Sequence, residues 1–169
     1  GTFDVDPVIE AETAAGAAER ARLGAHLADH GRREFIIPGI ALGMRYTGSP
    51  LVCDDGSDSV LDAAHEYVPT ARPGHRAPHV WLENGEALCD RFADGFTLLR
   101  TDFAVDAAAL LQAAAATGVP VTLLDVAEDA VRARYEAALV LIFPDGHVAW
   151  RGDAVPVDAQ NVIDRVRGA

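Results

Sequence analysis

The residues with the greatest potential for chemistry are two cysteines and six histidines. Cys53 and Cys89 lie far apart and form no C-x-x-C motif. We therefore interpret them as reduced thiols and expect a cytoplasmic protein. Cys89 directly precedes Asp90, and a neighbouring carboxylate raises rather than lowers the pKa of a thiol. This position favours a buried or half-buried structural cysteine over a nucleophile.

The histidines and the acidic residues do not form a metal-binding pattern. His75 and His79 are four residues apart, but Pro78 lies between them and no third ligand is close in the sequence. We interpret both as loop histidines. The acidic run at Asp54–Asp58 has its glycine at the wrong offset for an EF-hand, so we expect a solvated loop and no metal.

The chain contains 14 basic residues, and all of them are arginine. The missing lysine excludes a P-loop, a Schiff-base lysine and a Ser-Lys dyad. The spacing of Gly39 and Gly43 does not match the G-x-G-x-x-G dinucleotide fingerprint. We therefore expect neither catalytic nor cofactor-binding residues in this chain.

Charge and composition limit the possible partners. The formal net charge of −12 repels nucleic acid phosphates and anionic lipids. No apolar run approaches the ~18 residues that a membrane span needs. Half of the 169 residues are apolar, which is enough for a hydrophobic core. The chain begins at glycine rather than methionine, so we expect the natural protein to extend upstream.

The N-terminal third predicts a helix followed by irregular chain. Residues 6–30 are predicted to be helical, with Asp6 as the N-cap and Gly31 as the C-terminal stop. Residues 35–46 are apolar but contain Pro38, so we predict extended chain with a Pro-Gly turn. Residues 47–67 are predicted to be a loop.

The remaining sequence alternates short strands and helices. The predicted strands are residues 79–82, 96–100, 121–126, 138–143 and 147–150, and the predicted helices are residues 87–92, 106–116, 129–136 and 157–166. A β-α-β unit, a hairpin at Asp145-Gly146 and a closing helix are typical of an α/β thioredoxin-like mixed sheet with flanking helices. Strands 96–100 and 121–126 are expected to lie parallel in the centre of the sheet, buried on both faces.

This fold assignment divides the chain into three parts. Residues 1–49 form an N-terminal helix and connecting arm, residues 50–71 a loop, and residues 72–169 the thioredoxin-like domain. A redox thiol would need the helix N-terminus that follows the central strand, but residues 101–105 contain no cysteine. We therefore do not expect redox catalysis by this domain.

The first helix and the arm have apolar residues that the chain itself cannot easily cover. The helix has a thin, alanine-lined apolar face, which predicts packing against something larger. The arm is a candidate inter-domain or inter-subunit contact because its apolar density exceeds that of an ordinary loop. The residues proposed for this contact are Ile36, Ile37, Ile40, Leu42, Met44, Arg45 and Tyr46.

Four motifs carry a resemblance to a known family: RPGHRAPHVWL at residues 72–82, GFTLL at 95–99, PDGHVAWR at 144–151, and PGI with LGMRY within 38–46. Together they resemble the C-terminal domain of FAD-dependent aromatic-ring hydroxylases. These are the flavoprotein monooxygenases of the phenol, hydroxyphenylpropionate, polyketide and rifampicin hydroxylase type. The resemblance covers about Arg20 to Ala169.

The resemblance implies a cysteine-free thioredoxin-like domain, preceded by the last helix of a FAD-binding domain. FAD, NAD(P)H and the aromatic substrate would be bound upstream, so no flavin or catalytic residue transfers to this chain. The implied role is accessory: structural, lid or dimer contact, with the FAD- and substrate-binding domains or a second copy as partner. The alternative is a free-standing, redox-inactive thioredoxin-like binding module. A peroxiredoxin-like enzyme rests only on Arg76-Ala77-Pro78 and lacks the cysteine.

Overall fold

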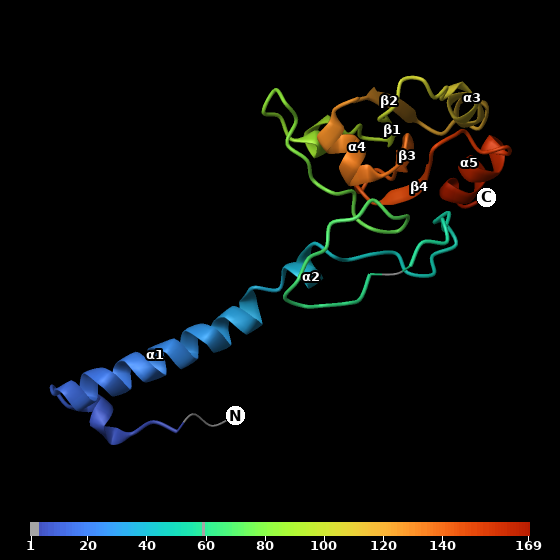
Figure 1. The fold of residues 1–169 in the computed structure, drawn as a ribbon. Helices are drawn as coiled ribbons and strands as arrows, with labels where there is room; N and C mark the ends of the chain where they lie inside the picture. Colours follow the sequence, from blue (N-terminus) through green and yellow to red (C-terminus); the bar gives the residue numbers. More distant parts are fainter. Residues whose placement is uncertain (1–3, 59) are drawn as a thin grey trace.

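The computed structural model describes residues 4–58 and 60–169. Gly1, the residue at which the sequence begins, lies outside the described residues. A compact α/β domain forms the C-terminal part, and a long helix, α1 (Ala14–Phe35), projects away from it (Figure 1). A connecting arm and a loop lie between the two. Among the described residues, none of the helices combines the length and the apolar character that crossing a membrane requires.

The domain is built on a four-stranded mixed sheet with the order β2-β1-β3-β4. The strands are β1 (Phe96–Arg100), β2 (Val121–Asp125), β3 (Leu139–Ile142) and β4 (Val148–Gly152). β1 pairs in parallel with β2 and antiparallel with β3, and β3 forms the predicted hairpin with β4. The mixed α/β fold class predicted from the sequence is confirmed.

Helices cover both faces of the sheet, because alternate side chains of each strand point to opposite sides. Leu98, Leu139 and Leu141 pack with α3 (Ala108–Ala116) and α5 (Ala159–Arg167). Leu99 and Val140 face the other way, towards α4 (Asp129–Tyr135) and the 3-10 turn η2 (Leu88–Arg91). All five of these strand side chains are fully buried, so the core of the molecule lies in this domain.

Two strand predictions were wrong in part. Residues 79–82 form no strand: only an isolated bridge joins Trp81 to Ala87. β2 lies at the edge of the sheet rather than in its centre, and Thr122 is exposed. Residues 79–82 stay outside the sheet because β3 pairs with the edge of β1 that β2 does not occupy. This pairing joins distant segments, so local sequence does not predict it.

The predicted first helix is divided in two. Asp6 caps a short 3-10 helix, η1 (Pro7–Glu10), by accepting from the Val8 amide at 2.9 Å. Helix α1 then begins after Thr13, whose hydroxyl accepts from the Gly16 amide at 3.2 Å. Gly31 does not end the helix, because it lacks the positive φ that a glycine stop adopts.

The arm also differs from the prediction. A one-turn helix, α2 (Pro38–Ala41), stands where a Pro-Gly turn within extended chain was expected. Pro38 suits the first helical position because its fixed φ is already helical. Gly39 packs against the following loop, and its amide donates to the carbonyl of Ala64 at 3.1 Å. The arm is therefore anchored to the loop rather than freely extended.

Candidate functional site

The end of the arm joins the domain by backbone pairing. The amide of Gly74 donates to the carbonyl of Val148 at 2.7 Å, so residues 74–77 lie along the outer edge of β4. The amide of Tyr46 in turn donates to the Gly74 carbonyl at 2.9 Å. These bridges cover an edge strand that would otherwise expose unpaired backbone groups.

Tyr46 reinforces this junction through its side chain. Its hydroxyl donates to the carboxylate of Asp145 in the β3–β4 turn. The centroids of the Tyr46 and His147 rings are 4.6 Å apart. The hydrogen bond raises the pKa of Tyr46. Burial acts to raise the pKa of Asp145, but the hydrogen bonds from Tyr46 and from the His147 amide outweigh it and lower that pKa. His147 Nδ1 lies 3.2 Å from Asp145 but is not aligned for a hydrogen bond.

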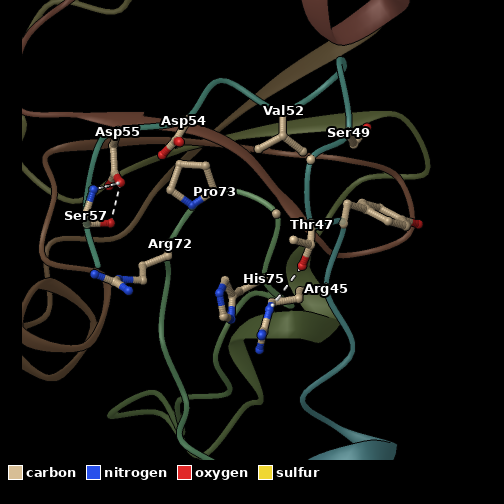
Figure 2. Close-up of a pocket in the computed structure, with 13 residues that line it drawn as sticks. Arg45, Thr47, Ser49, Val52, Asp54, Asp55, Ser57, Arg72, Pro73 and His75 are labelled. Carbon is tan, nitrogen blue, oxygen red and sulfur yellow. Dashed lines mark hydrogen bonds between the residues drawn. The ribbon is translucent and has the colours of Figure 1, made fainter. Parts of the chain in front are cut away.

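A cavity of about 270 Å³ lies between the arm, the loop and the domain (Figure 2). Its lining comes from two segments of the chain, residues 45–57 and 72–75. The lining residues are Arg45, Tyr46, Thr47, Gly48, Ser49, Val52, Asp54, Asp55, Ser57, Arg72, Pro73, Gly74 and His75. Its lining combines charged, hydroxyl and apolar side chains, and we take it as the candidate binding site.

Two of the charged groups that line the cavity, Arg45 and Asp55, are paired. Arg45 binds Asp62 at 2.8 Å and donates to the Thr47 hydroxyl at 3.2 Å. Asp55 accepts from Arg151 at 2.7 Å. Burial acts to raise the pKa of Asp55, but the hydrogen bonds from Ser57 and Arg151 outweigh it, so the pKa is lowered and the carboxylate stays ionised.

His75 is half-buried in the wall of the cavity. Burial lowers its pKa, and the positive charges of Arg45, Arg72, His147 and Arg151 lower it further. His75 is therefore neutral at pH 7 and is available to donate or accept a single hydrogen bond. It was interpreted from the sequence as a loop histidine, and the structure adds its place in the pocket.

The other residues considered for chemistry do not converge on this site. Cys53 is buried, and burial raises its pKa although Arg165 acts in the opposite direction. Cys89 is exposed rather than buried or half-buried, which corrects the prediction, and its sulfur lies 3.8 Å from His79 Nδ1. Both thiols are free. Among the residues the structure describes, no cluster of His, Cys, Asp or Glu has the arrangement of a metal site.

The junction after β1, where a redox thiol would lie in a thioredoxin-like enzyme, is filled by Thr101. Its hydroxyl donates to the Ala137 carbonyl at 2.6 Å and accepts from Arg132 at 3.3 Å. Helix α3 begins only at Ala108, so its N-terminus does not directly follow the strand. The junction therefore joins β1 to the chain before β3 and presents no nucleophile.

The arm residues proposed for a contact are mostly exposed. The exposed fractions are 59% for Ile36, 53% for Ile40 and 65% for Met44, and Leu42 and Tyr46 are also exposed. Ile37 and Arg45 are half-buried. Their role as an inter-domain or inter-subunit contact stays a prediction.

Sequence reasoning missed the cavity because its walls meet only through tertiary pairing. Thr47, Ser57 and Arg72 were assigned to loops, with no signal that they would meet. The available hint was that Arg45-Tyr46, residues 72–76 and Gly146-His147 all fall within the motifs that carry the family resemblance. The isolated bridges now show that these motifs lie next to each other.

Comparison with curated proteins finds relatives about three times as long as this chain. Aklavinone 12-hydroxylase RdmE from Streptomyces purpurascens is 35% identical over 158 residues, which cover 86% of the chain and 29% of the relative. Tetracenomycin B2 monooxygenase-dioxygenase from Streptomyces olivaceus is 38% identical over 149 residues, covering 80% and 27%. The chain therefore spans less than a third of the length of these relatives.

Solved structures agree with the sequence relatives. RebC-10x has a TM-score of 0.84 and 38% identity, covering 99% of this chain and 32% of that chain. The rebeccamycin biosynthetic enzyme RebC has a TM-score of 0.80 and 38% identity, covering 99% and 31%. Aklavinone-11 hydroxylase, solved in a complex with FAD and aklavinone, has a TM-score of 0.61 and 34% identity, covering 78% and 28%. The family model described as "Aromatic-ring hydroxylase, C-terminal" matches residues 70–169. The chain belongs to the C-terminal domain family of aromatic-ring hydroxylases.

Proposed function

We propose that this chain is the accessory C-terminal portion of a FAD-dependent aromatic-ring monooxygenase. In this proposal FAD, NAD(P)H and the aromatic substrate are bound by other parts of the parent protein. The chain itself supplies a structural, lid or dimer contact and carries out no chemical step. Relatives named as FAD-dependent monooxygenases and polyketide hydroxylases support the class of reaction.

One observation carries the proposal. The match to RebC-10x extends over 99% of this chain with a TM-score of 0.84, so it includes α1 and the arm as well as the domain. The projecting helix is thus a shared feature of a protein three times as long. A helix that buries only Gly16 within its own chain is understandable if most of its contacts lie in the remaining two thirds.

The contact surface would be formed by α1 and the arm. Helix α1 projects away from the sheet domain, and the arm lies between α1 and that domain (Figure 1). The apolar side chains of Ile36, Ile40 and Met44 would be removed from water when the upstream part packs there. The FAD- and substrate-binding domains are therefore the proposed partner, and a second copy of the chain is the alternative partner.

The first test is flavin binding by the isolated chain. We expect no flavin absorbance in the purified protein, no saturable FAD binding in a titration and no oxidation of NADPH above the buffer rate. The reason is that the described residues provide no glycine-rich turn for a pyrophosphate. The matched measurement is a longer protein from the same reading frame, which should retain FAD.

Two results would contradict the proposal. A yellow, flavin-loaded 169-residue chain would mean that it has a flavin site of its own. A reading frame without a FAD fingerprint upstream, together with no separate flavoprotein that associates with this chain, would instead favour the free-standing binding module.

A further inference from the structure

One arginine that lines the cavity at the arm–domain junction, Arg72, has no side-chain partner among the described residues. Arg72 is half-buried and lines the cavity, yet its guanidinium makes no hydrogen bond or ion pair with the residues the structure describes. By contrast, Arg45 binds the carboxylate of Asp62 at 2.8 Å, and Arg151 binds that of Asp55 at 2.7 Å. A guanidinium has five N–H donors, and those of Arg72 are open to solvent, so they are accessible to a ligand that enters the cavity.

Several basic side chains lie near Arg72, but Arg45 and Arg151 are each paired with a carboxylate, so Arg72 is the unpaired arginine on this side of the cavity. The charged neighbours that act on His75 are Arg45, Arg72, His147 and Arg151, and none of them is a carboxylate. In Figure 2 the nitrogen-bearing ends of Arg72, His75 and Arg45 lie on one side of Pro73, and Asp54 and Asp55 lie on the other.

The acidic wall limits which anion can enter. Asp55 is neutralised by Arg151, while Asp54 accepts only from the Gly56 amide at 2.9 Å and keeps its charge near the cavity. A doubly charged phosphate would be repelled by Asp54 more strongly than a singly charged carboxylate. The planar fork of a guanidinium also matches a carboxylate in a bidentate arrangement.

We propose that the Arg72 side of this cavity is a carboxylate-binding site, with Arg72 as the bidentate donor and His75 as a second hydrogen-bonding group. Val52 and Pro73 supply an apolar wall, so a carboxylate with an apolar body fits better than acetate. The carboxylate that binds here has two possible sources. One is a free small carboxylic acid, and the other is an aspartate or glutamate side chain from a protein segment that packs on the arm.

The test is a titration of the 169-residue chain with benzoate, followed by amide chemical shifts in NMR spectra. We expect saturable shifts confined to residues 45–57 and 72–75, and weaker binding of acetate. Arg72→Gln should weaken benzoate binding by roughly tenfold or more, because charge-assisted hydrogen bonds are lost. Arg76→Gln is the matched control, because Arg76 is exposed and does not line the cavity.

A third variant separates binding from folding. Arg72→Lys keeps the charge but not the fork, so it should bind benzoate more weakly than wild type and more tightly than Arg72→Gln. The proposal is overturned if benzoate gives no saturable shifts in these segments, if both glutamine variants weaken binding equally, or if inorganic phosphate binds as tightly as benzoate.

A longer protein that includes the upstream part distinguishes the two sources. If the short chain binds benzoate and the long one does not, a side-chain carboxylate of the parent occupies the site. Equal binding by both proteins assigns the site to a free acid. The proposal is independent of the flavin experiment, because a flavin-binding chain could still have this cavity.

Discussion

Tyr46 links two segments that are 99 residues apart in the sequence. Tyr46→Phe removes the hydroxyl that donates to Asp145 and keeps the ring against His147. We expect a loss of about 0.5–1.5 kcal/mol in the free energy of unfolding at pH 7, the usual contribution of one hydrogen bond. Chemical denaturation followed by circular dichroism measures this change.

The effect of this variant should depend on pH. The folded-state pKa of Asp145 is lowered, so its contribution to stability is present above the ordinary carboxyl pKa of about 3.9 and disappears as the pH falls through the folded-state pKa. The difference between Tyr46→Phe and wild type should therefore shrink in acid. Tyr67→Phe is the control, since the Tyr67 hydroxyl has no hydrogen bond among the described residues. An equal loss in both variants would disprove the link to Asp145.

At the scale of elements, the short helix α2 is held by close packing against the loop that follows it. A Cβ on Gly39 would lie 1.7 Å from the Ala63 carbonyl oxygen and 2.4 Å from that of Glu66, both backbone atoms. Gly39→Ala must therefore push the arm away from the loop, at a cost of about 1–3 kcal/mol for overpacking. We expect faster proteolysis within residues 36–68, measured by mass spectrometry of the fragments.

The matched control for Gly39→Ala is a glycine in an open environment. A Cβ on Gly31 meets nothing within 4 Å, and Gly31 lies inside α1. Gly31→Ala should leave the cleavage of residues 36–68 unchanged and favour the helix by up to ~1 kcal/mol. If Gly39→Ala were cleaved no faster than Gly31→Ala, the arm would not be anchored through this contact.

At the scale of the whole molecule, the domain has its own core while α1 and the arm leave apolar surface in water. Because of this surface, we expect the isolated chain to associate with itself as its concentration rises, as seen by light scattering. Replacing Ile36, Ile40 and Met44 by serine should reduce the association. Leu61→Ser is the control, since Leu61 is 88% exposed but lies outside the arm. A strict monomer with a protease-resistant arm would contradict this expectation.

The sequence predicted best the structural features that depend on residues close to one another in the chain. The strand at Phe96–Arg100 has the predicted bounds, and the hairpin follows from Asp145-Gly146 between two apolar runs. The last helix, predicted at residues 157–166, is α5 (Ala159–Arg167), and Asp158 caps it by accepting from the Asn161 amide at 2.9 Å. These features depend on side-chain period, turn chemistry and capping, which are all local.

Other features were decided by contacts between distant segments. Residues 79–82 have the composition of a strand, but β3 rather than this segment fills the second side of β1. Residues 121–126 have the composition of a central strand, yet β2 lies at the edge. An apolar run of this length indicates burial without indicating which strand will be its neighbour.

The sequence by itself determined the α/β class, the family and the lack of a cysteine at the strand–helix junction, because these depend on residue identity and local pattern. Only the tertiary structure brought Arg45, Arg72 and His75 to one cavity and left the Arg72 side chain without a partner in the described part of the chain. The physical reason is that backbone pairing of residues 45–46 with 74–75, and of residues 74–77 with β4, joins segments that are otherwise separate loops. Loop composition does not specify such pairing.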